Sequence, residues 1–248
     1  EHRHIYIYIY MFRNADNECY FKYRDKIKDK NFTINDLDHF PLYIGIHNFA
    51  RKFFIISELN KTLDLTGNIM EFGIWKGSTS ILLGGWYNIS RPFSHKKIIL
   101  FDTFRGITDA SQHDKQKEDS NGLYKGISKE GFQNLIKERN LDNLYEIVEG
   151  NVCETVKSYF ENCSLKSVSF VIFDMDVYKP TSEAIKYVLP NLVPGGKIIF
   201  DEATDGNWLG ETKALNELIT MAEKLNYKYT IKENNITAQP TTVFTRIS

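Results

Sequence analysis

Carboxylates recur at one kind of place along this chain, the carboxyl ends of short apolar runs. Five runs rich in Ile, Val and Phe end in, or are followed by, an acid; these acids are Glu71, Asp102, Glu149, Asp174 and Asp201. If the runs are parallel strands of one open sheet, their acids meet at the edge where such sheets bind ligands. Neighbouring carboxylates repel one another unless cations, amines or hydroxyls lie among them. The pattern therefore predicts a site for a cationic or polyhydroxylated ligand, although one or two of the acids could simply stabilise a helix N-terminus.

The turn after the first run, Glu71 to Ser80, indicates what kind of ligand this is. Gly73 lets the backbone approach a ligand closely, and Ser78 and Thr79 offer hydroxyls or caps for a following helix. The dinucleotide fingerprint needs glycines two and five residues beyond Gly73, where Trp75 and Ser78 stand instead. A phosphate-binding Gly-Lys-Ser/Thr sequence is missing as well. The turn favours a nucleoside that carries an amino acid group and no phosphates.

An alternation of strands and helices has to position these residues. Strands are predicted at Asn68–Phe72, Lys97–Phe101, Tyr145–Val148, Val168–Phe173 and Lys197–Phe200. Helices are predicted at Ser78–Asn88, Lys129–Arg139, Cys153–Asn162, Pro180–Leu189 and Glu211–Leu225. Two last runs, Tyr227–Lys232 and Thr241–Arg246, should form an antiparallel hairpin. The fold class is therefore α/β, a doubly wound, mostly parallel, seven-stranded sheet of the Rossmann-like kind.

Two segments stand outside this alternation. Residues 1–60 are expected to form an N-terminal extension before a domain at 61–248, with a helix over Leu42–Leu59 and an extended arm at His4–Tyr10. The arm is either a loosely held end or a strand that pairs with a second copy of the chain in a homo-oligomer. Residues 105–128 are too long for an ordinary connection and predict a lid-like insertion or a solvated loop.

Composition narrows the classes of function. The 248 residues carry 31 Lys and Arg against 32 Asp and Glu, a net charge of −1, which disfavours nucleic acid and anionic lipid as partners. The three cysteines, Cys19, Cys153 and Cys163, lack metal-ligand spacing and are an odd number, so we expect a reducing cytoplasm. We find neither a signal peptide pattern nor an apolar run long enough to cross a bilayer.

The turn from Glu71 to Gly77 resembles the acid-x-Gly-x-x-x-Gly motif of class I S-adenosylmethionine-dependent methyltransferases. Further blocks narrow the resemblance to the macrocin-type sugar O-methyltransferases; they are Phe101–Gly106, Gly150–Asn151 with Glu154–Thr155, Phe173–Tyr178 with Thr181, Pro194–Gly196 and Asp201–Glu202. The similarity runs from about Glu71 to Leu218. It implies methyl transfer from S-adenosylmethionine to a small-molecule acceptor, such as a sugar, a glycan or a sugar nucleotide.

The resemblance also implies where the donor binds. Its amino acid end would lie along the first turn, its ribose at the acid after the second strand, and its adenine beside the turn after the third. An ionised carboxylate suits the ribose because it only accepts hydrogen bonds. The implied cofactor-binding residues are Glu71, Gly73, Gly77, Ser78, Thr79, Asp102, Thr103, Gly150 and Asn151.

Chemistry at the acceptor follows from the same resemblance. It implies a magnesium ion held by Asp174, Asp201 and Glu202, and it matches Asp176 to a general base. Hard oxygen ligands suit magnesium. The family commonly has two aspartates and a tyrosine where this chain has Asp201, Glu202 and Ala203, so the ligand oxygens and one wall of the acceptor site differ here. Asp176 could instead be a structural carboxylate. The insertion at 105–128 and Trp208 are candidate acceptor contacts.

Other functions stay open at this point. One is an N- or O-methyltransferase that acts on a non-sugar molecule without metal, and another is a non-catalytic nucleoside-binding protein. A nicotinamide-dependent dehydrogenase shares the alternating elements, but the glycine pattern after the first strand disfavours it.

Overall fold

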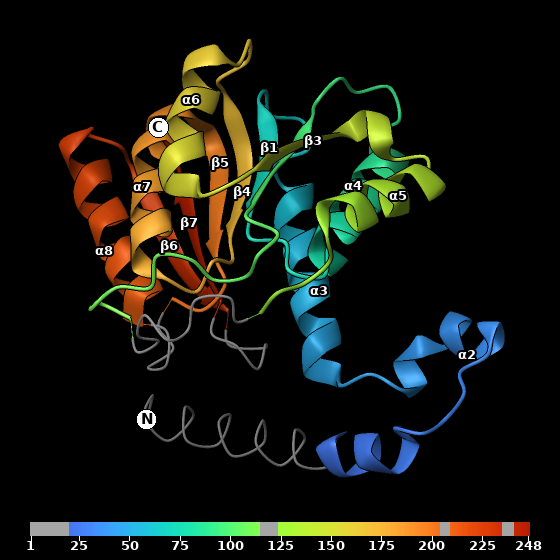
Figure 1. Ribbon diagram of the computed structural model, residues 1–248. Coiled ribbons are helices and arrows are strands. Elements are labelled where there is room, and N and C mark those ends of the chain that lie inside the picture. Colours follow the sequence, from blue (N-terminus) through green and yellow to red (C-terminus); the bar gives the residue numbers. More distant parts are fainter. Residues whose placement is uncertain (1–19, 115–123, 204–208, 235–240) are drawn as a thin grey trace, which may run out of the picture. The chain divides into compact units, whose positions relative to one another are not determined.

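The computed structural model describes residues 20–114, 124–203, 209–234 and 241–248 (Figure 1). The chain divides into two compact units, Glu1–Ile55 with Asn235–Ala238, and Ile56–Asn234 with Gln239–Ser248. The predicted arm at His4–Tyr10 and the candidate acceptor contact Trp208 lie outside the described residues. Within the described residues, none of the helices has the length and apolar character that crossing a membrane requires.

The first unit is built from short helices. Residues 20–27 are helical, and α2 (Ile34–Asp38), the 3₁₀ turn η1 (Phe40–Leu42) and α3 (Ile46–Asn60) follow. Thr33 and Asp36 form a capping box that fixes the start of α2. The helix predicted over Leu42–Leu59 thus begins four residues later, and the boundary between the units falls inside it.

The second unit holds a seven-stranded sheet with the order β3-β2-β1-β4-β5-β7-β6. Its strands are β1 (Asn68–Phe72), β2 (Ile98–Asp102), β3 (Tyr145–Glu149), β4 (Val168–Phe173), β5 (Leu192–Phe200), β6 (Tyr229–Asn234) and β7 (Thr241–Arg246). The pairs among β1 to β5 are parallel, while β7 is antiparallel to both β5 and β6. The strand order reverses between β1 and β4, and this confirms the predicted doubly wound fold and terminal hairpin.

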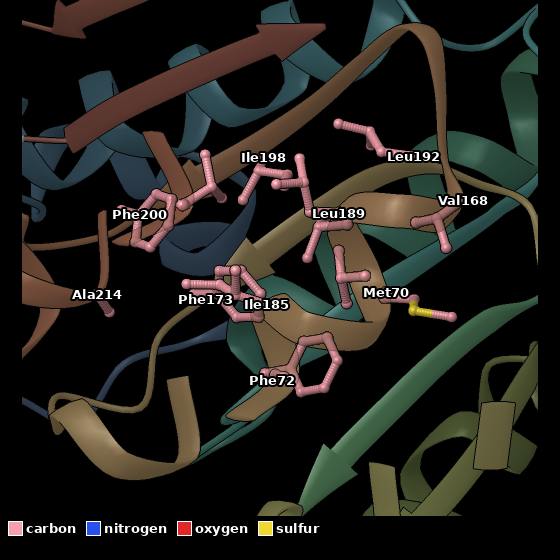
Figure 2. Packing of buried hydrophobic residues seen from close by; sticks show 14 of the residues in the cluster. Met70, Phe72, Val168, Phe173, Ile185, Leu189, Leu192, Ile198, Phe200 and Ala214 are labelled. Atoms are coloured by element: carbon pink, nitrogen blue, oxygen red, sulfur yellow. The ribbon is translucent and has the colours of Figure 1, made fainter. Parts of the chain in front are cut away.

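Helices cover both faces of this sheet. They are α4 (Ser78–Ser90), α5 (Lys129–Glu138), α6 (Val152–Asn162), α7 (Tyr178–Asn191) and α8 (Leu209–Lys224), with the 3₁₀ turn η3 (Asp142–Leu144) before β3. In Figure 1, α6, α7 and α8 lie along one face, and α4 and α5 lie along the other. Figure 2 shows the core under α7, where Ile185 and Leu189 pack against Met70, Phe72 and Phe173 of the sheet. Coverage on both faces explains why the parallel strands read as apolar runs.

The strands β2, β3 and β6 differ from their predicted bounds by one or two residues, and β5 differs by more. β5 begins at Leu192 and not at Lys197, because the Pro194-Gly195-Gly196 sequence lies within it as an irregularity. Val168 of β4 pairs with Leu192 and Phe170 pairs with Lys197, so the intervening residues bulge out of the ladder. A bulge can accommodate a proline and two glycines, but in a sequence these residues normally indicate a turn.

Candidate functional site

A row of aromatic rings supports the carboxyl edge of the sheet. Phe72 of β1 pairs in register with Phe101 of β2 and with Phe173 of β4, and Phe173 pairs with Phe200 of β5. The four side chains are fully buried, and successive ring centroids lie 4.5, 5.0 and 5.3 Å apart. This phenylalanine row aligns the ends of the four strands at one level. The residues that directly follow the four phenylalanines therefore lie side by side at the carboxyl edge of the sheet.

The residues that follow the phenylalanine row are predicted site residues, Gly73, Asp102, Asp174 and Asp201. The ladder continues one residue beyond the row, because the amides of Gly73, Asp174 and Asp201 donate to carbonyls of the row at 2.9, 2.9 and 3.1 Å. The sheet thus brings the acids after β2, β4 and β5 to adjacent positions around the end of β1, as the sequence predicts. Glu71, also buried, lies one residue before the row within β1.

Gly73 makes a close approach of two backbones possible. Its φ is +85°, and an added Cβ would lie 1.9 Å from the carbonyl oxygen of Asp174. No side chain fits in that space, so the first turn lies directly against the start of the loop between β4 and α7.

Asp102 fixes the first turn from the side of β2. Its Oδ2 accepts from the amide of Ile74 at 2.6 Å, and its Oδ1 accepts from the amide of Phe104 at 2.6 Å. Each carboxylate oxygen still has a second lone pair for a ligand hydroxyl. Thr103, beside it, donates its hydroxyl to the carbonyl of Gly106 at 2.8 Å, which closes the turn after β2.

The start of α4 corrects one expectation. Ser78 and Thr79 were expected to cap this helix, but its N-cap is Gly77 in the left-handed conformation, with no side-chain cap hydrogen bond. An added Cβ at Gly77 would lie 2.7 Å from the ring of Phe132, so packing against α5 requires glycine there. Ser78 is exposed and Thr79 is buried. The first amides of α4 consequently receive no side-chain acceptor at the N-cap, and helix N-termini of this kind favour an anionic ligand group.

The turn after β3 is tied to the insertion. Asn151 caps α6 through the amide of Cys153 at 2.9 Å and donates its side-chain amide to Asp109. Lys179, at the start of α7, contacts the other oxygen of Asp109 at 2.6 Å. Hydrogen bonds from Lys179 and Asn151 outweigh the effect of burial, which would raise the pKa of Asp109, and hold that pKa below its usual value. Gly150 provides the bend before Asn151, with φ +133°.

Three further contacts hold the described ends of the insertion. Asp114 is buried and accepts from the backbone amide of Tyr178 at 2.9 Å. At the other end, the amide of Ile127 donates to the carbonyl of Trp75 at 2.9 Å, and the Trp75 and Tyr124 rings meet edge to face. The described parts of the predicted insertion are thus anchored beside the first turn and α7, although residues 115–123 lie outside the structure.

The loops after β4 and β5 contain an acid that the sequence interpretation missed. Glu211, in the first turn of α8, is fully buried, and its two oxygens accept from the backbone amides of Asp176 at 3.4 Å and Glu202 at 3.1 Å. Burial raises the pKa of Glu211 well above its usual value, and the charges of Asp176, Asp201 and Asp174 raise it further. The two hydrogen bonds place this buried carboxyl group against the backbone of the predicted base, Asp176, and of the predicted metal ligand Glu202.

The positions of the predicted metal ligands differ in exposure. Asp174 is half-buried, while Asp201 and Glu202 are 4% and 5% exposed. Across residues 20–114, 124–203, 209–234 and 241–248, no three His, Cys, Asp or Glu side chains are gathered in a way that could hold a metal ion. The ends of β4 and β5 thus supply carboxylate oxygens, which are hard donors, but Asp174, Asp201 and Glu202 are not gathered as a ready metal site.

Glu149 lies one strand further from β1 than Asp102. It ends the edge strand β3, pairs in register with Asp102, and contacts Lys129 of α5 at 3.0 Å, with 43% of its side chain exposed. Its backbone thus lies beside Asp102 at the predicted edge, while its side chain forms an exposed ion pair of the kind that contributes little to stability.

Comparisons with known proteins show which family and which fold this chain resembles. A family model described as macrocin-O-methyltransferase (TylF) matches residues 53–219, well over half of the chain. A Streptomyces olivaceus protein, 8-demethyl-8-(2,3-dimethoxy-alpha-L-rhamnosyl)-tetracenomycin-C 4'-O-methyltransferase, is 22% identical over 142 residues, which are 55% of this chain and 52% of that protein. The chain thus spans about half the length of this curated relative.

Solved structures show the same fold. CalS11, described as a calicheamicin methyltransferase, has a TM-score of 0.75 at 21% identity, with 93% of this chain and 91% of that chain covered. The O-methyltransferase from Bacillus cereus in complex with SAH has a TM-score of 0.54 at 13% identity, with 94% and 91% covered. At these identities the likeness establishes the architecture alone.

Proposed function

This chain belongs to the macrocin-O-methyltransferase family, and we propose that it transfers the methyl group of S-adenosylmethionine to a hydroxyl group of a sugar. The observation that carries the proposal is the set of acids that the phenylalanine row aligns around the glycine turn after β1. Both the tetracenomycin enzyme and CalS11, also described as a TDP-rhamnose 3'-O-methyltransferase, are named for rhamnose substrates. We therefore take a deoxyhexose, as a sugar nucleotide or attached to a larger molecule, as the acceptor.

The geometry offers a place for each part of the donor. The carboxylate of its methionine part would lie at the N-terminus of α4, where Gly77 supplies no side-chain cap. The ribose hydroxyls would donate to Asp102, and Gly150 and Asn151 would border the adenine. The positively charged sulfonium would then lie near Asp174, which the close approach at Gly73 brings beside the first turn.

Methyl transfer requires an acceptor oxygen in line with the carbon–sulfur bond. As the new oxygen–carbon bond forms, the carbon–sulfur bond breaks and its electron pair stays on sulfur, which gives S-adenosylhomocysteine. The hydroxyl proton passes to the carboxylate of Asp176. Asp176 has a left-handed backbone with φ 66°, a conformation that its surroundings must hold in place. Alignment of two bound reactants can account for about 7–11 kcal/mol of barrier reduction in favourable cases.

Magnesium is a separate proposal within the same site. The donor chemistry suits it, since Mg²⁺ is usually held by one or two carboxylates together with water and substrate oxygens. Asp174 and Asp201 at neighbouring strand ends would hold the ion, and Glu202 is the third candidate. When bound, the ion would supply positive charge beside the developing alkoxide.

We propose a reducing compartment such as the cytoplasm, because the three cysteines are an odd number without metal-ligand spacing. Cys153 and Cys163, which lie within the described residues, are both free thiols.

Donor binding gives the first prediction. Calorimetric titration should show that S-adenosylmethionine and S-adenosylhomocysteine bind, whereas an adenine dinucleotide does not, because the turn after β1 lacks a pyrophosphate cradle. Methyl transfer is then measured by mass spectrometry with TDP-rhamnose, rhamnosylated small molecules, a catechol and an amine as acceptors. Transfer to the catechol or the amine alone would contradict the sugar assignment, and dinucleotide binding would contradict the donor site.

Magnesium binding gives the second prediction. We expect Asp174→Asn to weaken Mg²⁺ binding by about tenfold or more, because a neutral amide replaces one of two charged ligands. The measurement is calorimetric titration with MgCl₂, and Asp142→Asn, on the exposed turn η3, is the control for loss of one negative charge. Equal Mg²⁺ affinity in Asp174→Asn and wild type would refute the metal assignment, and full methyl transfer in the presence of EDTA would show that the reaction needs no metal.

A further inference from the structure

Glu211 occupies a position that its helix alone does not explain. An acid in the first turn of a helix commonly interacts with the amides of that turn and stays near solvent. Glu211 is instead 0% exposed, and its two oxygens accept from amides outside α8. Burial of a carboxyl group is costly unless hydrogen bonds compensate for it. The hydrogen bonds from the amides of Asp176 and Glu202 therefore compensate for the burial of Glu211.

The two contacts join different loops. Oε1 accepts from the amide of Asp176, in the loop between β4 and α7, and Oε2 accepts from the amide of Glu202, in the loop after β5. These loops carry the proposed base and the proposed metal ligands. One carboxyl group thus links the backbones of two neighbouring strand ends, just beyond the point where Phe173 and Phe200 pair.

The backbone conformation of Asp176 depends on contacts such as this link. Its φ of 66° lies in the left-handed region, which a non-glycine residue keeps only where its surroundings determine it. The hydrogen-bonded ladder between β4 and β1 ends at Asp174, whose amide donates to the carbonyl oxygen of Phe72. The amide of Asp176, two residues further along, donates to Oε1 of Glu211 at 3.4 Å. Glu217, one and a half turns further along α8, bonds instead to Tyr178 and Ser182 of α7.

We propose that Glu211 is a positioning residue that fixes Asp176 relative to Asp201 and Glu202 by binding one backbone amide of each loop. Its effect on catalysis rests on the proposed methyl transfer, whereas the link itself does not. Glutamine at this position keeps the size of the side chain but has a single acceptor oxygen, and its NH₂ group would face one of the two amides. Glu211→Gln therefore breaks one link without leaving a cavity.

The test compares wild type, Glu211→Gln and the control Glu217→Gln, which changes an acceptor on the same helix that bonds to the side-chain hydroxyls of Tyr178 and Ser182 and not to a backbone amide of either loop. Hydrogen exchange followed by mass spectrometry reports on peptides that cover residues 174–178 and 200–203. We expect exchange in at least one of them to rise about tenfold or more in Glu211→Gln, because local opening needs less free energy. Glu217→Gln should leave both peptides at the wild-type rate.

Kinetics separate positioning from general destabilisation. We expect kcat of Glu211→Gln to fall about 10- to 100-fold, with the KM for S-adenosylmethionine within about threefold of wild type, because misplacement of the base impairs transfer more than donor binding. Unchanged exchange in both peptides would overturn the link, and increased exchange with wild-type kcat would overturn its positioning role. If wild type methylates none of the acceptors, the proposed function fails, and the exchange result alone decides whether Glu211 joins the loops.

Discussion

Replacement of Asp176 by asparagine is expected to lower kcat by about 10²- to 10⁴-fold, the range typical for loss of a general base. Asparagine has the same shape and tolerates the left-handed backbone found at this position, so the fold should be unaffected. It cannot accept the hydroxyl proton. The measurement is kcat and KM for both substrates across a pH range, with the donor affinity from calorimetry.

A matched control isolates the role of the proton acceptor. Asp142→Asn removes an exposed carboxylate on η3 and should leave kcat within about twofold of wild type, as surface substitutions usually do. If Asp176→Asn keeps kcat within about fivefold of wild type, Asp176 is a structural carboxylate and another group takes the proton.

Replacement of Gly73 by alanine is the second change with a large expected effect. The added methyl group would lie 1.9 Å from the carbonyl oxygen of Asp174, in a residue whose φ is +85°. A left-handed conformation alone costs an L-residue about 1–2 kcal/mol, and relief of the overlap requires the first turn and the β4–α7 loop to separate. We expect unfolding to need about 3 kcal/mol less free energy, and donor affinity to fall at least about tenfold. Urea unfolding and calorimetry measure these two quantities.

The helix that follows this turn, α4, contains a control for the glycine. Gly85 lies in α4, and an added Cβ there meets no atom within 4 Å. Gly85→Ala should therefore stabilise the protein by about 0.5–1 kcal/mol through helix propensity. Wild-type donor affinity and unchanged stability in Gly73→Ala would show that the close approach of the two backbones is not required.

Much of the fold could be predicted because burial on both faces leaves a continuous signal. The inner strands β2 and β4 are buried apolar runs, and the final hairpin stands out because no helix-length segment separates its strands. The irregular start of β5 was missed since a proline and two glycines normally indicate a turn, while the pairing of Leu192 with Val168 depends on a strand far away in sequence.

The site was partly predictable for a related reason. Acids after parallel strands meet at one edge whatever the details of packing, so Asp102, Asp174 and Asp201 could be grouped from the sequence. The capping of α4 could not be predicted, because Gly77 is chosen by its contact with Phe132 of α5 and not by local preference. Contacts between distant segments determine such details.

Glu211 was missed although the sequence contains its signal. Buried residues of α8 follow it at helical spacing, at Ala214, Leu215, Leu218 and Ala222. An acid that begins such an apolar stripe must be buried with it and must find partners inside the protein. The sequence analysis used Glu211 only as the first residue of the helix predicted at Glu211–Leu225.

The phenylalanine row has a consequence for the charges above it. Hydrocarbon directly beneath the acids keeps water from reaching them from inside the sheet, so their field is weakened by solvent from one side only. A cation that enters at this edge is attracted more strongly than it would be by the same carboxylates on an open surface.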